Sequence, residues 1–324
     1  MAPIRVGILR GGPGSEYEVS LQSGASVLKH LPSDKYQPVD ILLSRTGEWY
    51  VGGVRQSPEQ AVRHFDVIFN ALHGEFGEDG QVQHLLDYLQ KPYTGSGAVA
   101  SALGMDKPKA KAMMARAGLR VPDGVVVRQS DETDAEAVAY DAFKKIPPPW
   151  IVKPAGGGSS VGVRLARNYP ELVAAVAGAF ENDDRILIEE YIRGNEATAG
   201  VVEGLRGQDH YPLLPIEIVT PAHKTVFDYE AKYGEGTAKI CPGRFSSEIK
   251  AELERQATLI HQLLGLRHYS RADFILSPRG IYVLEVNTLP GLTEHCPLPK
   301  ALTAAGIVYP DFLDHLVSLA LARR

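Results

Sequence analysis

Short apolar runs alternate with polar, helix-like stretches through the first third of the chain. The runs cover residues 4–9, 39–43 and 67–72. A helical pattern begins at Val19, between the first two runs. Strands and helices that alternate at this spacing favour a parallel sheet with flanking helices. Glycine-rich stretches follow the first and third runs, at 11–14 and 74–80. Because ligands of parallel sheets gather at the carboxyl ends of the strands, both stretches are candidate binding loops.

The remainder of the chain combines further strand-like runs with a long helix. Apolar residues recur on one helical face at Ile249, Leu253, Ala257, Ile260 and Leu264. This spacing predicts a helix that stops at Gly265. A second helix is predicted at 107–117 and a last one at 312–324. Strand-like runs lie at 150–153, 186–191, 272–276 and 281–286.

Turn residues near 95 and 194 divide the chain, whose 324 residues exceed one ordinary core. We therefore predict an α/β fold (α+β overall) with three domains. A Rossmann-like parallel-sheet domain spans 1–95, a central domain spans 96–194 and a C-terminal domain spans 195–324.

Composition narrows the class of protein. The net charge of -5 gives no polybasic surface for nucleic acid or an anionic membrane. Only two cysteines are present, which is no disulfide framework and indicates a reducing compartment. The first residues do not form a signal peptide, and no apolar run approaches the roughly 18 residues of a spanning helix. These features predict a cytoplasmic, soluble enzyme or binding protein.

A carboxylate and an amide lie two residues apart in the last strand-like run. Alternation along a strand puts Val283, Glu285 and Asn287 on one face. Tyr282, Leu284 and Val286 then face the other way. If the run at 272–276 pairs with this strand, Asp273 adds a third oxygen ligand of the kind that magnesium prefers. An edge strand with a solvated polar face is the alternative for this pattern.

A second candidate is the glycine-rich loop that follows Lys153. Its glycines, two hydroxyls and lysine suit a loop that folds over a polyphosphate, although a flexible surface loop has the same composition. The lysine precedes the glycines, so this is not a Walker A loop. The early GGPGSE does not match the dinucleotide-binding fingerprint G-x-G-x-x-G.

Taken in order, the motifs resemble the D-alanine–D-alanine ligase family of the ATP-grasp superfamily from about residue 4 to 310. They are GSEYEVSLQSG, HGEFGEDG, YTGSG, MDKPKAK, VKPAGGGSSVGV, IEEYIRGNE, FDYEAKY, SRADF and EVNTLPGLT. The resemblance implies the ATP-grasp fold and an ATP-dependent ligase. It further implies that this ligase joins two D-alanines through an acyl phosphate for peptidoglycan precursor synthesis, and that it is a homodimer in the cytoplasm.

The resemblance also assigns an ATP site. It implies that Lys107, Lys153 and Ser160 contact the phosphates, and that Lys232 closes over the terminal phosphate on a lid at 227–233. Glu189, Glu190, Tyr191 and Ile192 follow the adenine, and Glu196 contacts the ribose. Two Mg²⁺ ions, or Mn²⁺ in their place, are held by Asp273, Glu285 and Asn287.

The amino-acid site is implied in the same way. Glu18 pairs with the ammonium of the first amino acid, and Ser159 and Tyr233 are its hydrogen-bonded partners. His73 lies near the same amino acid. Arg271 and the backbone N–H of Gly291 stabilise the tetrahedral oxyanion.

One segment departs from the family. A Ser-Leu pair usually grips the carboxylate of the second amino acid, but Cys296 and Pro297 stand there. A thiol is a weak donor, and proline has no N–H. A related ATP-grasp ligase with another amino-acid or amine acceptor is therefore the main alternative. A nucleotide-binding regulator without catalysis is disfavoured by Arg271, and a dinucleotide oxidoreductase by the absent fingerprint.

Overall fold

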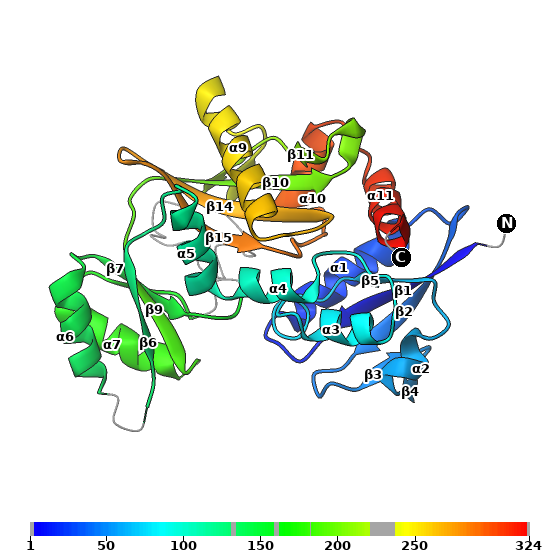
Figure 1. Ribbon diagram of the computed structural model, residues 1–324, viewed down its shortest axis with the longest axis horizontal. Helices are drawn as coiled ribbons and strands as arrows, with labels where there is room; N and C mark the ends of the chain where they lie inside the picture. Colours follow the sequence, from blue (N-terminus) through cyan, green and yellow to red (C-terminus); the bar gives the residue numbers. More distant parts are fainter. Residues whose placement is uncertain (1–2, 131–133, 159–161, 182, 221–236, 323–324) are drawn as a thin grey trace.

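Three β-sheets, one after another along the chain, form the framework of the described part of the molecule (Figure 1). The structure is a computed structural model that describes residues 3–130, 134–158, 162–181, 183–220 and 237–322. Each sheet is built from one continuous stretch of sequence, so motifs of the three stretches approach one another where these parts of the molecule meet.

The first sheet has the strand order β4-β3-β2-β1-β5. Its strands are β1 (Ile4–Gly11), β2 (Tyr36–Leu43), β3 (Trp49–Val51), β4 (Val54–Gln56) and β5 (Val67–Asn70). Its helices are α1 (Tyr17–His30), α2 (Pro58–Val62) and α3 (Gln81–Tyr88). β1 pairs in parallel with β2 and β5. The parallel sheet predicted from the first three apolar runs is confirmed, and β3 and β4 extend it as antiparallel strands that were not predicted.

The second sheet is antiparallel, with the order β6-β9-β7-β8. Its strands are β6 (Gly124–Arg128), β7 (Trp150–Pro154), β8 (Arg164–Ala166) and β9 (Arg185–Glu190). Helices α6 (Ala135–Lys145) and α7 (Tyr169–Phe180) pack on it, and the fully buried Trp150 belongs to their common core.

The third sheet has the order β13-β12-β10-β14-β15, with β11 paired to β10. Its strands are β10 (Asn195–Glu203), β11 (His210–Pro212), β12 (Ile216–Val219), β13 (Ala238–Ile240), β14 (Tyr269–Ser277) and β15 (Gly280–Asn287). A short 3-10 helix, η1 (Leu205–Gly207), joins β10 to β11. Helix α9 (Ser247–Leu263) packs on this sheet through Leu253, Ala257 and Ile260, which are buried as the periodicity predicted.

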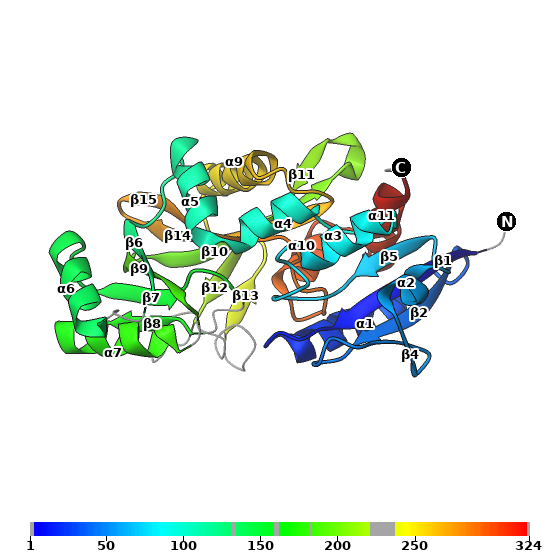
Figure 2. The same ribbon diagram turned by 60° about the horizontal axis from the view of Figure 1, so that its bottom comes forward.

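Some helices pack against a sheet that belongs to another part of the chain. Helices α4 (Ala98–Met105) and α5 (Lys107–Arg116) contact β15 and share its core. The C-terminal helix α10 (Pro297–Ala304) contacts β10, and α11 (Tyr309–Ala322) returns to the first sheet, beside β5 and α1 (Figure 2). The domain limits near 95 and 194 stay predictions.

Among the described helices, none is by itself long and apolar enough to cross a membrane. The bent pair α10 and α11 reaches that length and composition only in combination.

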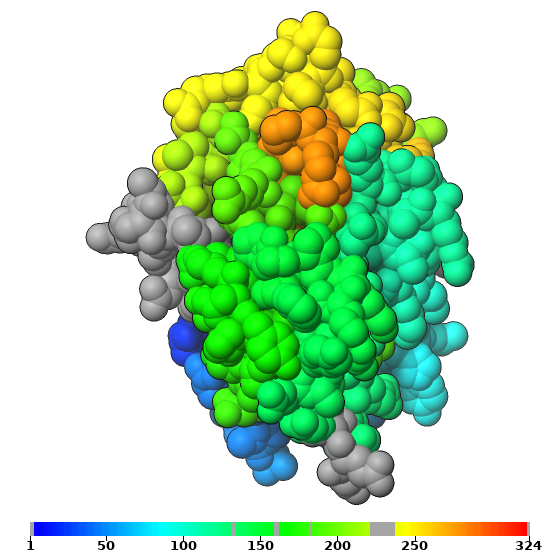
Figure 3. Space-filling model, turned by 90° about the vertical axis from the view of Figure 1, so that its left-hand side faces the viewer, coloured from blue at the N-terminus to red at the C-terminus, as the bar shows by residue number. Residues whose placement is uncertain are grey.

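The second and third sheets meet along one side of the molecule. Figure 3 views this side, where the orange β14–β15 hairpin comes to the surface beside the green residues of the second sheet. An ion pair between Arg279 and Glu190, 2.7 Å long, joins the hairpin turn to the end of β9. Residues predicted from several separate motifs meet at this junction.

Candidate active site

A cavity of about 630 Å³ lies between the second and third sheets. The second sheet and the segment after it contribute the predicted residues Lys153, Glu189, Glu190, Tyr191 and Ile192. The third sheet and the loop after it contribute Glu196, Arg271, Asp273, Glu285, Gly291 and Cys296. Residues assigned to the adenine, ribose, metal and oxyanion sites therefore surround one volume of suitable size for a nucleotide and a small substrate.

A buried carboxylate between two lysines forms one wall of this cavity. Glu189 makes an ion pair of 2.7 Å with Lys153 and a second, close one with Lys111 of helix α5. Burial lowers the pKa of Lys111 to about 7, although Glu189 opposes that shift. Burial also acts to lower the pKa of Lys153, but the carboxylates of Glu189 and Glu285 outweigh it and raise that pKa. Lys153 is thus held as a cation.

Lys111 was not identified from the sequence. Its motif, MDKPKAK, drew attention to Lys107, which lies one helical turn earlier. Lys107 borders a second, smaller cavity of about 30 Å³, where its ammonium donates to the carbonyl oxygens of Gly156 (3.1 Å) and Gly157 (2.6 Å). Both lysines therefore approach the glycine-rich loop and its strand, but at different depths.

The predicted metal ligands lie on two paired strands. β14 and β15 are antiparallel, and Asp273 stands opposite Glu285, which confirms the predicted pairing of these strands. The amide of Asn287 donates to Asp273 Oδ2 at 3.0 Å. The guanidinium of Arg271 donates to both Asp273 oxygens, at 2.9 and 3.0 Å, and is thereby fixed in the cavity wall.

The alternation predicted for β15 is interrupted by a β-bulge. The register shifts after Asp273, so that Phe274 pairs with Val283 and Leu284 has no partner in the ladder. Val283 is consequently buried under helix α9, whereas Leu284 and Glu285 both line the cavity. The prediction that Val283 shares the face of Glu285 is wrong, because a bulge inserts one residue and reverses the faces before it.

Glu18 does not lie at either cavity. Its side chain is 66% exposed and makes an ion pair of 2.9 Å with Arg45. Glu16, which sequence reasoning missed, is only 5% exposed and borders the smaller cavity beside Lys107, Glu285 and Asn287. We therefore take Glu16, rather than Glu18, as the candidate acid of the GSEYEVS motif.

The positions of the two acids at the start of helix α1 explain why Glu16 is buried and Glu18 is exposed. Glu16 is the N-cap residue of this helix, turned toward the glycine-rich loops, whereas Glu18 lies in the first turn on the exposed side. A Cβ at Gly74 would lie 2.5 Å from Glu16 Oε2, and one at Gly158 would lie 2.6 Å from it. Both loops thus depend on glycine where they approach this carboxylate. The glycines of these two loops were the sequence feature from which a close approach to Glu16 could have been inferred.

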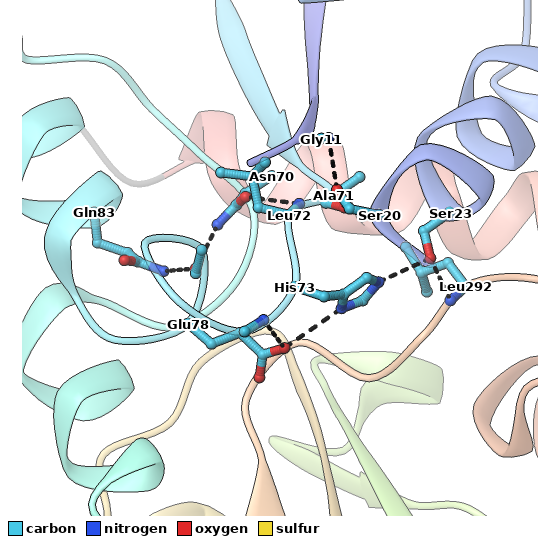
Figure 4. Close-up of polar contacts among 12 residues, drawn as sticks. Gly11, Ser20, Ser23, Asn70, Ala71, Leu72, His73, Glu78, Gln83 and Leu292 are labelled. Carbon is cyan, nitrogen blue, oxygen red and sulfur yellow. Dashed lines mark hydrogen bonds and ion pairs between the residues drawn. The ribbon is translucent and has the colours of Figure 1, made fainter. Parts of the chain in front are cut away.

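His73 connects the first sheet to the loop after β15 (Figure 4). Its Nε2 lies 2.8 Å from Ser23 Oγ, and its Nδ1 lies 3.4 Å from Glu78 Oε1. Ser23 Oγ also accepts a hydrogen bond of 3.3 Å from the N–H of Leu292, which follows Gly291. His73 is therefore positioned to orient this loop, and Glu78 borders the smaller cavity.

Cys296 and Pro297, where the sequence departs from the family, lie in the wall of the larger cavity. Cys296 is buried at the start of helix α10, and Pro297 is the first helical residue. A Cβ at Gly291 would lie 2.6 Å from Cys296 Sγ, so the thiol packs directly on the predicted oxyanion donor. Lys239, also missed from the sequence, lines the same cavity and donates to the carbonyl oxygen of His295 at 2.9 Å.

Some predicted residues lie outside the described part of the chain. They are Ser159, Ser160, Lys232 and Tyr233. The lid predicted at 227–233 belongs to the same undescribed part.

Family models and a full-length relative match the chain. The model described as "D-ala D-ala ligase C-terminus" matches residues 113–318, and that described as "D-ala D-ala ligase N-terminus" matches 5–61 and 52–96. A D-alanine–D-alanine ligase of Syntrophobacter fumaroxidans is 38% identical over 320 residues, covering 98% of each chain.

Solved structures agree with these matches. The VanG D-Ala:D-Ser ligase from Enterococcus faecalis has a TM-score of 0.84 and 28% identity, covering 98% of this chain and 99% of its own. The D-alanine–D-alanine ligase from Bacillus anthracis complexed with ATP has a TM-score of 0.81 and 29% identity, covering 98% of both chains. The predicted ATP-grasp fold is confirmed, as is the class of ATP-dependent ligase acting on amino acids. The chain belongs to the D-alanine–D-alanine ligase family.

Proposed function

We propose that this enzyme joins two D-alanine molecules through an acyl phosphate, forming D-alanyl-D-alanine for peptidoglycan precursors. The observation that carries the proposal is the single cavity in which Lys153, Arg271 and Asp273 converge from two sheets. A cation for a transferring phosphoryl group and a guanidinium for an oxyanion are the two electrostatic elements that this chemistry needs.

The phosphate end of ATP is assigned to Lys153 and Lys107. Glu189 and Glu285 keep Lys153 protonated, so that it offers a full positive charge in a buried wall. Charge in such a position stabilises the phosphoryl oxygens more strongly than it would in water.

Asp273, Glu285 and Asn287 are proposed to hold two Mg²⁺ ions, with Mn²⁺ as a substitute. The donors fit, since two carboxylates face each other across paired strands and the amide of Asn287 contacts Asp273. Oxygen-only donors suit a hard ion that keeps water and phosphate as its other ligands. When bound, these ions neutralise charge on the phosphates.

Arg271 is the proposed donor to the tetrahedral oxyanion, together with the N–H of Gly291. Its two hydrogen bonds to Asp273 fix the guanidinium before substrate arrives. Preorganisation of this kind is what makes such donors effective, because no reorganisation is needed in the transition state.

Glu16 is the proposed partner of the first amino acid's ammonium. Its carboxylate is buried next to Gly158, at the junction of the glycine-rich loop and the smaller cavity. Ser159 and Tyr233 remain proposed to complete this contact. His73 acts on the same region through Ser23.

The structure constrains the binding site of the second amino acid less than the other assignments. Among the first three positions of α10, Pro297 and Pro299 have no N–H, so only Leu298 is able to donate from the backbone. Lys239 brings a positive charge to the wall beside Cys296 and offers a carboxylate another partner. A similar structure is that of a D-Ala:D-Ser ligase. An acceptor other than D-alanine is therefore the second candidate function.

The test is an ATP-dependent phosphate-release screen over pairs of D- and L-amino acids, with mass detection of the product. We expect D-alanyl-D-alanine as the main product and loss of turnover in Glu285→Gln. A different mixed dipeptide would favour the second candidate, and no amino-acid-dependent phosphate release would refute both. The homodimer and the cytoplasmic location stay predictions.

A further inference from the structure

A histidine-rich cluster lies on the face of the third sheet opposite the cavity. Its members are Glu203 at the end of β10, His210 at the start of β11 and His261 in the last turn of α9. The imidazole of His261 contacts Ser270 Oγ at 2.8 Å. Ser270 and Arg271 are neighbours on β14, so their side chains point to opposite faces, and only Arg271 lines the cavity. The cluster is therefore separate from the active site.

The three side chains offer one ligand atom each within 4.8 Å of one another. His261 is completely buried, and its Nε2 has no hydrogen-bond partner in the described structure. Glu203 Oε1 lies 3.6 Å from this nitrogen. That separation is too long for a good hydrogen bond. It is close to the roughly 3.4 Å expected between two tetrahedral ligands that each lie about 2.0–2.1 Å from zinc.

We propose that Glu203, His210 and His261 bind a single Zn²⁺ ion, with Nε2 of His261 and Oε1 of Glu203 as two of its ligands. Water completes the coordination. Glu203 and His210 are only half-buried, so an ion is able to reach the buried imidazole from solvent. Two imidazoles and one carboxylate form a borderline-soft set that favours zinc over magnesium.

Surrounding groups hold the ligands in place. The N–H of His268 donates to Glu203 Oε2 at 2.6 Å, which leaves Oε1 directed at His261.

His210 also has a supporting contact. The side-chain amide of Gln262 lies 3.3 Å from His210 Nδ1. A half-turn of that amide presents its oxygen to an Nδ1–H, which fixes the tautomer whose Nε2 is able to bind a metal. His261 is oriented in the same manner by Ser270.

The bound ion would tie together three elements that are distant in sequence. Helix α9 packs against both β10 and β11, and the ion would add a direct link among their ends. Since the ion binds only the folded arrangement, it would raise the thermal stability of the enzyme by mass action.

The experiment uses the full chain without a purification tag, stripped with chelator and then dialysed against Zn²⁺ in excess Mg²⁺. The Mg²⁺ occupies oxygen-only sites. We expect one tightly bound Zn²⁺ per chain and a higher Tm on its addition. In His210→Ala, which removes a ligand, the affinity should fall by more than about 100-fold, and in Gln262→Ala, which removes only its support, by about 10- to 100-fold.

Two variants serve as controls. His64→Ala removes an exposed histidine in the turn after α2 and should bind Zn²⁺ as the wild type does. Asp273→Asn alters the active site and should also keep the ion. The proposal is overturned if the wild type binds no Zn²⁺ under these conditions, or if His210→Ala binds it as tightly. Equal losses in His64→Ala and His210→Ala would overturn it as well.

Discussion

Single substitutions of Glu16 and Glu18, at the start of helix α1, should show which of the two acids binds the first amino acid. Glu16→Gln removes the charge of the buried carboxylate and keeps its shape, next to Gly158 and the smaller cavity. Glu18→Gln makes the same chemical change two residues away, where the side chain is exposed and paired with Arg45. The pair is matched in chemistry and differs only in the direction that each side chain takes.

The expected magnitude follows from the environment of each carboxylate. A hydrogen bond between a buried carboxylate and a substrate ammonium contributes about 1.5–3 kcal/mol. Because about 1.4 kcal/mol corresponds to a factor of ten, losing this bond should weaken the first amino acid roughly 10- to 150-fold. Exposed ion pairs contribute little, so Glu18→Gln should change neither binding constant by more than about twofold.

The assay is the initial rate of ADP formation over a D-alanine titration at saturating ATP, fitted with separate constants for the two amino acids. We expect Glu16→Gln to raise the first constant and to leave the KM for ATP almost unchanged. Thermal unfolding of both variants checks that the fold is retained. The reasoning is refuted if Glu18→Gln weakens the first amino acid while Glu16→Gln, still folded, behaves as the wild type.

Three further predictions concern the cavity. Glu189→Gln leaves two buried lysines without their acid and should lower the free energy of unfolding by about 3–5 kcal/mol in urea titration; an unchanged midpoint would contradict the proposed pairing. Chelation of divalent cations should abolish ADP formation, and Mn²⁺ as well as Mg²⁺ should restore it; full activity in chelator would remove the metal assignment. Lys239→Met should raise the binding constant of the second amino acid more than that of the first. Adding Cys296→Ser and Pro297→Leu to this variant should restore binding of the second amino acid. Equal effects on both constants would show that this wall does not bind the acceptor.

The elements with regular periodicity were predictable from the sequence. The three apolar runs of the first sheet and the long helix α9 are formed largely where the pattern indicated. Burial of one face specifies such elements strongly, because a shift of register would expose it. Strands β3 and β4 are only three residues each, too short for any pattern to be recognised.

Contacts between residues that are distant in the sequence were harder to predict. Lys111 and Glu189 are separated by 78 positions, and neither motif alone indicates that the two side chains meet. Glu16 and Glu18 are equally acidic in the sequence, and only the start of the helix decides which one is buried. The general location of the site thus follows from the order of motifs, whereas the partner of each side chain depends on packing between sheets.

The metal-ligand strand shows why one part of a local prediction holds when another fails. The bulge at Leu284 lies before both Glu285 and Asn287, so the two-residue spacing between these ligands is undisturbed. Residues on the other side of the bulge exchange faces, which buries Val283 and turns Leu284 toward the cavity. Leu284 then packs with Ile192 and Tyr282, giving the cavity an apolar surface directly beside its carboxylates. A flat purine and a charged phosphate chain would need those two surfaces next to each other, and the bulge adds the apolar one beside carboxylates whose spacing it leaves unchanged.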